Sequence, residues 1–393
     1  MSSSPARLPA AVYALGFGVF ALVTSEFQVA ALMNIMTADL HITLPMTGYL
    51  ITVYALAMAI GGPLLALLLL RHPPRRSLII LLVLFIASQA SGAVAGSYLP
   101  LIIARILTGA VAGAFIGCAV STGVKLVPGQ QTSAAITVVL GGLMIGTVIG
   151  LPLASFIGNL AGWRISFWSV VVISLLALWL THKTLPSSME PDRINLADEL
   201  RALKNLTLWR AYTTSLLIIG ATFAGFSYFT PILTAQTGFS SGQVTGLLLV
   251  YGMATVLGNA VVGRLAARFS LPVIACGLLA LAVFFVLFAR FIQQPSVAIA
   301  SVIGVGLFGV TMNPAMVTRV MAAAGNRQLV NTLHTSMVTF GLMLGSLLGG
   351  LSIEYGFGLS APLWIGAGMA LCGLLTLIPD MKTAQPGVCR EVS

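Results

Sequence analysis

Apolar residues run in long segments along the whole 393-residue chain, and short polar connections separate them. A helix needs about 20 apolar residues to cross the hydrocarbon core of a bilayer. Applied along the chain, that length predicts twelve spans, at roughly 10–33, 46–70, 77–97, 99–122, 133–157, 164–182, 208–232, 242–266, 271–291, 296–319, 329–352 and 359–379. Short connections make neighbouring helices antiparallel. The pattern therefore predicts an all-α integral membrane protein.

The basic residues give an independent test of this topology. With the N-terminus in the cytoplasm, only Arg164 and Arg290 of the 19 Lys and Arg residues fall outside, and Arg105 lies within a span. The apolar run after Arg7 is too long for the apolar core of a cleaved signal, so we expect it to remain as the first span. We expect a multi-pass protein of the plasma membrane, here a bacterial inner membrane, with both termini in the cytoplasm.

One long connection divides the spans six and six. We expect residues 1–183 to form an N-terminal six-helix bundle and residues 184–207 a solvated cytoplasmic linker rather than a regulatory helix. Residues 208–393 then form a C-terminal six-helix bundle with a short cytoplasmic tail. This division predicts two pseudo-symmetric halves.

Composition excludes several other classes of protein. Only 7% of residues are charged and 58% are hydrophobic, whereas an ordinary soluble domain has roughly 25% charged residues. The net charge of +10 is spread through short loops, which does not indicate nucleic-acid binding. The four cysteines are far apart with no CxxC pair, so we expect neither a disulfide nor a metal site, and no cofactor.

Ionisable residues inside spans are few and therefore informative, because each costs free energy unless it faces a cavity or a partner. The first helix runs outward, and Glu26 lies about 24 Å from its inner end. The fourth helix runs inward, and Arg105 lies about 9 Å from its outer end. Both residues are therefore expected at a similar depth in the membrane. We interpret them as a proton-coupling pair; the alternative is a permanently charged structural pair. We expect His334, near the inner end of its helix, to be a polar residue at the membrane surface, close to the lipid headgroups.

The fifth span and two cytoplasmic turns carry candidate gating residues. Gly142, Gly146 and Gly150 form a stripe that lets another helix approach closely, and Pro152 favours a bend. Basic clusters occupy two equivalent turns, one with Arg75 and Arg76 and the other with Arg264 and Arg268.

These motifs resemble those of a known family. Over its full length the chain resembles a twelve-helix drug:proton antiporter of the major facilitator superfamily. Residues 101–113 match the arginine motif to which this family's proton coupling is assigned, the glycine stripe resembles its antiporter motif, and residues 162–168 resemble its turn into the sixth helix. Leu67 and Arg71 stand where the family has glycine and aspartate in its helix 2–3 loop. The closest resemblance is to the chloramphenicol-resistance and sugar-efflux branch.

The resemblance implies a central cavity lined by helices 1, 2, 4, 5, 7, 8, 10 and 11. The polar and aromatic candidates for substrate contact there are Gln28, Asn34, Tyr54, Tyr228, Tyr251, Asn259, Asn313 and Asn331. A mostly apolar cavity with few charges suits neutral or weakly amphipathic substrates.

Three functional hypotheses follow. The first is a proton-coupled exporter of chloramphenicol-like drugs, which would confer multidrug or antibiotic resistance by alternating access. The second is an exporter of sugars, nucleosides or related metabolites with the same fold, and the third is a non-transporting membrane sensor. The chain has no P-loop and no HExxH or GxSxG motif, so we expect neither ATP-driven transport nor an enzyme with catalytic residues. The expected partners are a small molecule, protons and the lipid bilayer, and the expected state is a monomer.

Overall fold

The computed structural model describes residues 8–69, 71–186, 204–325 and 328–383, and within these ranges every regular element is helical. The first six spans contain α1 (Ala10–Leu40), α2 (Leu44–Leu69), α3 (Pro74–Ala93), α4 (Tyr98–Lys125), η1 (Gly129–Gln131), α5 (Thr132–Ile145), η2 (Gly146–Gly150), α6 (Leu151–Ala161) and α7 (Trp163–Thr184). The last six contain α9 (Leu206–Phe226), α10 (Phe229–Ala235), α11 (Ser241–Arg290), α12 (Pro295–Phe308), η3 (Val310–Met312), α13 (Asn313–Ala324), α14 (Gln328–Glu354) and α15 (Ala361–Thr383).

Twelve helical stretches among the described residues are long and apolar enough to cross a membrane. Some spans combine several elements: η1 to α6 form one span (Gly129–Ala161), and α9 with α10 form another (Leu206–Ala235). Conversely, α11 contains two spans, which meet at a kink at Phe269. The predicted all-α membrane fold with twelve spans is therefore confirmed.

The break between α5 and α6 has a local cause. Pro152 has no amide hydrogen, so it cannot make the regular hydrogen bond to the preceding turn. The five residues Gly146–Gly150 form a π-helix instead, closed by the amide of Leu151 donating to the carbonyl of Gly146. A widened turn that contains Gly146 and Gly150 of the glycine stripe thus precedes Pro152.

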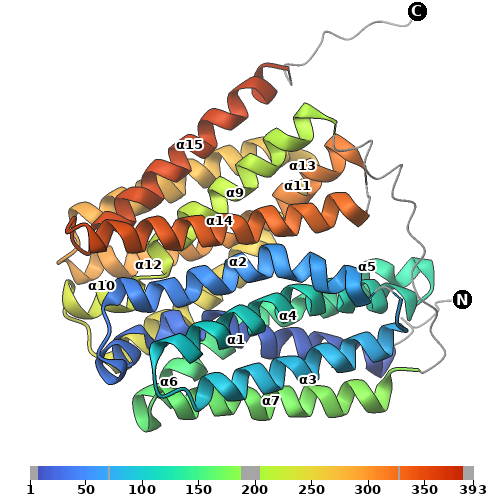
Figure 1. Cartoon of the computed structure of the whole chain (residues 1–393). Helices are drawn as coiled ribbons and strands as arrows, with labels where there is room; N and C mark the ends of the chain where they lie inside the picture. The colour runs from blue at the N-terminus through green and yellow to red at the C-terminus, as the bar shows by residue number, and fades with distance from the viewer. Residues whose placement is uncertain (1–7, 70, 187–203, 326–327, 384–393) are drawn as a thin grey trace, which may run out of the picture.

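The helices form two adjacent groups (Figure 1). In that view α1, α3, α4 and α7 lie on one side and α9, α13, α14 and α15 on the other, with α2 and α14 packed together at the boundary. Most of the predicted linker 184–207, namely residues 187–203, lies outside the described residues.

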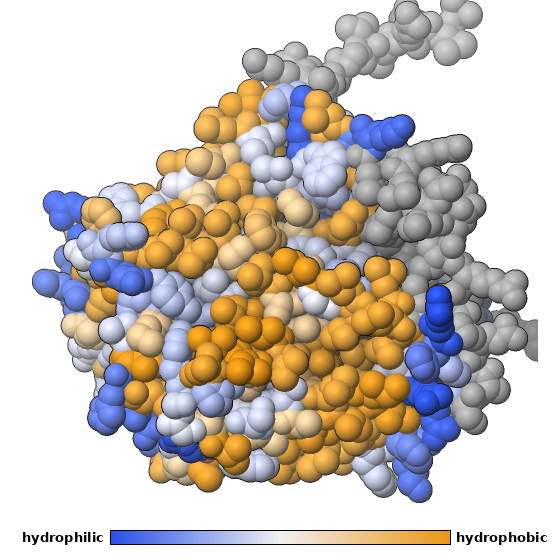
Figure 2. Space-filling model, viewed as in Figure 1, coloured by the Kyte–Doolittle hydropathy of each residue, from blue (hydrophilic) through white to orange (hydrophobic). Residues whose placement is uncertain are grey.

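A broad apolar surface covers the centre of one face of the molecule. Figure 2 shows apolar side chains across the centre of this face and hydrophilic ones mainly at its two ends. Large apolar residues are exposed in both groups of helices, among them Leu64, Leu257 and Leu375, each with more than half of its area exposed. Such apolar surface is stable against lipid tails rather than water.

Candidate functional site

Arg105 is buried in the first six spans and makes four hydrogen bonds there. Its Nη1 donates to the carbonyl of Ser25 at 3.0 Å and to the Ser25 hydroxyl at 3.2 Å. Its Nη2 donates to the carbonyl of Glu26 at 3.3 Å, and its Nε to that of Leu50 at 3.5 Å. These acceptors come from α1 and α2, so one guanidinium of α4 joins three helices.

Tyr54 completes the surroundings of this guanidinium. The Cζ atom of Arg105 lies 4.1 Å from the centre of the Tyr54 ring, a cation–π contact. The tyrosine comes this close because Gly109 of α4 lies directly against α2: a Cβ atom on Gly109 would stand 3.0 Å from the Cα of Tyr54. The small residue therefore sets the helix spacing that brings Tyr54 to Arg105.

Glu26 lies beside this arginine, but its carboxylate is not paired with it. Arg105 bonds the backbone carbonyl of Glu26, and within the described residues the carboxylate makes no hydrogen bond or ion pair. The charges still interact through space. Glu26 is partly accessible, although Ser25 and Gln28 on the same helix are completely buried. The structure thus brings Glu26, Arg105 and Tyr54 together, with the carboxyl group of Glu26 outside the hydrogen bonds of the guanidinium.

Gln28 lies in a buried polar cluster on the side of α1 that faces α3 and α7. Gln89 of α3 donates to its carbonyl oxygen at 3.1 Å, and Gln28 donates to the hydroxyl of Ser166 at 2.9 Å. Ser25 donates to Gln89 at 2.8 Å, which connects this cluster to Arg105. Both groups of the Gln28 amide are therefore engaged with neighbouring helices.

Tyr251 belongs to an aromatic cluster between the first and last six spans. Its ring stacks on Phe226 with centroids 4.7 Å apart, and Phe226 meets Phe27 edge to face at 5.8 Å. Phe27 also stacks on Phe223 at 5.8 Å. Phe27 follows Glu26 in α1, so the cluster meets α1 at the same helical turn as the acidic residue.

Asn34 and Tyr228 lie toward the end of the bundle where α1 passes into α2, which we call the α1–α2 end. Asn34 donates to the hydroxyl of Thr234 at 2.8 Å, joining α1 to α10. Tyr228 donates to the carbonyl of Ser346 at 3.0 Å, and its ring carbon Cζ would stand 2.8 Å from a Cβ on Gly48. In this structure both side chains thus contribute to contacts that close this end.

The other three candidates for substrate contact lie on separate helices. Asn259 is on α11, Asn313 begins α13 and Asn331 is near the start of α14; each is partly buried. Their substrate contact stays a prediction.

The glycine stripe of the fifth span packs against α1 along its whole length. A Cβ on Gly142 would stand 2.8 Å from the amide nitrogen of Phe20, and one on Gly146 would stand 3.0 Å from the Cβ of Val23. At Gly150 it would stand 3.0 Å from the Cβ of Thr24. The stripe therefore positions the helix that carries Glu26.

The four basic residues of the two turns have different surroundings. Arg75 donates to the carbonyl of His182 at 2.8 Å and so joins the start of α3 to the end of α7. Arg268 lies over the ring of Phe269 at 5.2 Å, and Arg76 and Arg264 are exposed. Their part in gating stays a prediction.

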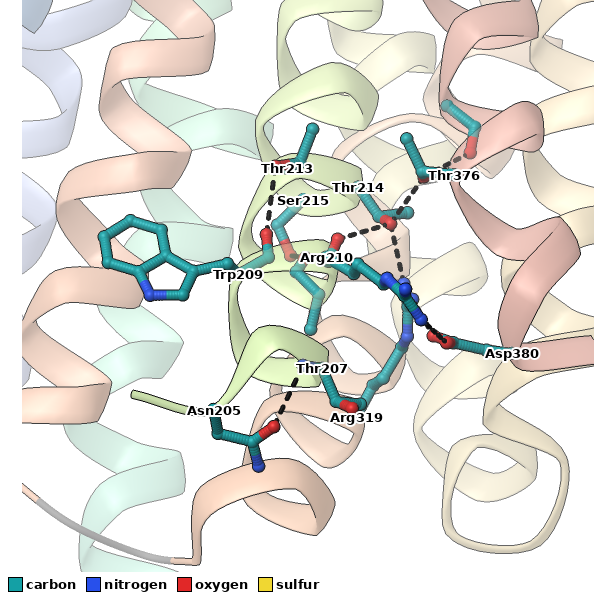
Figure 3. Close-up of polar contacts among 12 residues, drawn as sticks. Asn205, Thr207, Trp209, Arg210, Thr213, Thr214, Ser215, Arg319, Thr376 and Asp380 are labelled. Atoms are coloured by element: carbon teal, nitrogen blue, oxygen red, sulfur yellow. Dashed lines mark hydrogen bonds and ion pairs between the residues drawn. The ribbon is translucent and has the colours of Figure 1, made fainter. Parts of the chain in front are cut away.

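A second buried arginine was not singled out by the sequence reasoning. Arg319 of α13 is 6% exposed, forms an ion pair with Asp380 of α15 and donates to the hydroxyl of Thr214 of α9 at 2.7 Å. Figure 3 shows Arg210 reaching the same carboxylate, at 3.6 Å, and Thr376 bonding Thr214. Arg319 and Asp380 lie at the ends of predicted spans, where a charge normally indicates solvent. The structure extends the last helix past residue 379 to Thr383 and so includes Asp380 in it.

His334 is also more buried than expected. It is 5% exposed, lies 3.0 Å from the hydroxyl of Ser215 and stacks on Tyr212 with centroids 6.0 Å apart. It therefore packs between α14 and α9 rather than among lipid headgroups. Among the described residues no group of His, Cys, Asp and Glu side chains could hold a metal ion.

Comparison with known proteins supports a single assignment. The family model of the Major Facilitator Superfamily matches residues 14–328 and 235–388. The chain is 30% identical over 387 residues to a chloramphenicol resistance protein of Streptomyces lividans, covering 96% of this chain and 99% of the relative. It is 29% identical over 380 residues to the inner membrane transport protein YdhP of Escherichia coli K12, covering 96% and 97%.

A solved structure agrees with the sequence relatives. The crystal structure of the human organic anion transporter MFSD10 (TETRAN) matches with a TM-score of 0.70 at 13% identity, covering 95% of this chain and all of that one. At this identity the match shows the fold. With the twelve spans and the family match along nearly the whole sequence, this chain belongs to the Major Facilitator Superfamily of membrane transporters.

Proposed function

We propose that the chain is a proton-coupled exporter of small neutral or weakly amphipathic organic molecules, of the chloramphenicol type, in a bacterial inner membrane. The observation that carries the proposal is the Glu26 carboxylate, unpaired and partly accessible beside a guanidinium that makes four hydrogen bonds to α1 and α2. A carboxyl group in this position can bind and release one proton without breaking an ion pair.

Export requires that the site be reached from each side of the membrane in turn. In our proposal residues 1–183 and 208–393 move as two halves, with both termini in the cytoplasm, as a monomer. The α1–α2 end is then the outer end, and the contact of Asn34 with Thr234 helps to close it. Protonation of Glu26 from outside and release of its proton inside would drive substrate outward.

The substrate class rests on the site and on one relative. Phe27, Phe223, Phe226 and Tyr251 supply apolar and aromatic surroundings at the helical turn of Glu26, with Arg105 already engaged by backbone carbonyls. Such surroundings favour a neutral aromatic compound over a charged one. The relative from Streptomyces lividans, described as a chloramphenicol resistance protein, supports the same class.

The experiment compares driven transport with exchange. In everted vesicles, Glu26→Gln should abolish chloramphenicol uptake driven by a pH gradient but keep exchange of labelled for unlabelled drug, because exchange needs no net proton movement. Asp39→Asn, which changes an exposed acid of the same helix that pairs with Arg164 within the first six spans, is the control and should keep driven uptake. Uphill uptake by Glu26→Gln would refute the coupling. Wild-type vesicles that carry sugars or nucleosides but not chloramphenicol would refute the substrate class.

A further inference from the structure

A chain of hydrogen bonds leads away from Arg105 through the interior of the first six spans. Arg105 Nη1 donates to the Ser25 hydroxyl at 3.2 Å, and that hydroxyl donates to Oε1 of Gln89 at 2.8 Å. Gln89 Nε2 donates to Oε1 of Gln28 at 3.1 Å, and Gln28 Nε2 donates to the Ser166 hydroxyl at 2.9 Å. We call these four neutral residues, Ser25, Gln89, Gln28 and Ser166, the polar chain.

The polar chain ends on backbone and has one direction. Ser166 donates to the carbonyl of Ala154 in α6, at 3.1 Å. Every link therefore donates away from the guanidinium, so each dipole turns its negative end toward the positive charge. Hydrogen bonds aligned head to tail polarise one another, more strongly at low dielectric. The four members are at most 1% exposed, so water does not weaken this effect.

The polar chain explains why Arg105 need not pair with Glu26. A buried guanidinium without compensation would be drawn to the nearest carboxylate. Here the aligned dipoles, the carbonyls of Ser25 and Glu26 and the ring of Tyr54 surround it instead. Of the titratable groups around Glu26, Arg105 faces it from α4 and Tyr54 from α2, while α9 contributes the aromatic side chains that touch Phe27.

We propose that the polar chain is a positioning device for proton coupling: it holds Arg105 charged and turned toward α1, which keeps the carboxylate of Glu26 available to a proton. Gln89 and Ser166 then influence transport although neither touches Glu26. This inference rests on the proposed role of Glu26. It also gives α3 and α7 a part in coupling, through Gln89 and Ser166.

The test breaks the polar chain at its centre. Gln89→Leu keeps the approximate volume but removes the acceptor of Ser25 and the donor to Gln28. Without the aligned dipoles the charge of the guanidinium is less compensated, so it should be drawn toward Glu26 and hold it ionised, and the pH at half-maximal driven uptake of chloramphenicol should fall by about one unit. Exchange of chloramphenicol at fixed pH should change by less than about twofold, because its apolar site is intact.

A matched pair of serines separates positioning from packing. Ser166 and Ser174 are both on α7 and both fully buried, but Ser174 donates only to the carbonyl of Val170 in its own helix, at 2.7 Å. Ser166→Ala should move the pH profile in the same direction as Gln89→Leu, and Ser174→Ala should leave it unchanged. If Gln89→Leu does not fold, the comparison of Ser166→Ala with Ser174→Ala tests the inference by itself.

The outcomes distinguish this inference from the function on which it rests. If Glu26→Gln loses driven uptake while Gln89→Leu and Ser166→Ala keep the wild-type pH profile, the polar chain is only structural and the inference is overturned. Equal shifts for Ser166→Ala and Ser174→Ala would overturn it as well. If Glu26→Gln keeps driven uptake, the proposed function itself fails.

Discussion

Arg105 donates to three backbone carbonyls, those of Ser25, Glu26 and Leu50, and only a planar group with several donors can reach all three. Arg105→Lys supplies one compact ammonium that cannot reach all three carbonyls, so the buried charge loses hydrogen bonds, at a cost of about 1–3 kcal/mol. We expect a lower unfolding temperature in detergent and loss of driven transport.

A second arginine provides the control for this substitution. Arg75 makes one described bond, to the carbonyl of His182, which a lysine can replace. Arg75→Lys should therefore unfold close to the wild-type temperature. Equal changes in the unfolding temperature for the two substitutions would show that the planar guanidinium of Arg105 is not required.

At this scale the sequence predicted the central residues but not their surroundings. Counting residues along two antiparallel helices was enough to place Glu26 and Arg105 at one depth. The roles of Gln89 and Ser166 could not be predicted, because a single polar residue in an apolar helix reveals depth but not the direction it faces. Gln28 shows the same limit: its position favoured the cavity, whereas the structure turns it toward α3 and α7.

Among the elements, the contact between the fifth span and α1 depends on glycine. Gly142→Ala places a methyl group 2.8 Å from the amide nitrogen of Phe20 and should destabilise the protein by about 1–3 kcal/mol. Its neighbour Gly141 has nothing within 4 Å of an added Cβ, so Gly141→Ala should be neutral or slightly stabilising. Thermal unfolding of both variants in detergent checks this; equal unfolding temperatures would contradict the contact.

The connection of α9, α13 and α15 depends on one carboxylate. Asp380→Asn leaves the buried Arg319 without its counter-charge and should destabilise the protein by about 3 kcal/mol. In the pair of Asp39 with Arg164 both side chains are more than a third exposed, so Asp39→Asn should cost less than about 1 kcal/mol. Chemical or thermal unfolding that ranks Asp39→Asn as the more harmful change would refute this account.

Element boundaries show what a hydropathy pattern can and cannot give. All twelve spans were predictable because each long apolar segment fits the bilayer thickness. The π-helix at Gly146–Gly150 was not predictable, because Pro152 indicates a break in the helix but not the backbone conformation at the break. The Arg319–Asp380 pair was missed because charges at span ends normally indicate solvent.

On the scale of the whole molecule, the first and last six spans are joined at the α1–α2 end. Replacing Asn34 and Thr234 by cysteine, after removal of the four native cysteines, should allow a cross-link that stops transport. Alternating access requires these residues to separate, and reduction should restore activity. Radiolabelled drug uptake before and after oxidation measures the effect.

A cross-link within one group of helices is the control. The hydroxyls of Thr37 in α1 and Thr47 in α2, both in the first six spans, lie 2.9 Å apart. Cysteines at these two positions should cross-link without blocking transport. Full transport with the Asn34–Thr234 positions cross-linked would exclude opening at this end.

Apart from the bond of Tyr49 to the carboxylate of Glu354, the contacts described here between the two groups of helices at the α1–α2 end join uncharged groups. Thr230 donates to the carbonyl of Ala30 at 2.8 Å, and the hydroxyls of Ser155 and Thr245 share a bond of 2.7 Å. Dissolved ions screen interactions between exposed charges but have little effect on such neutral bonds. A closure made this way keeps nearly the same strength whether the cell lives in fresh water or in brine.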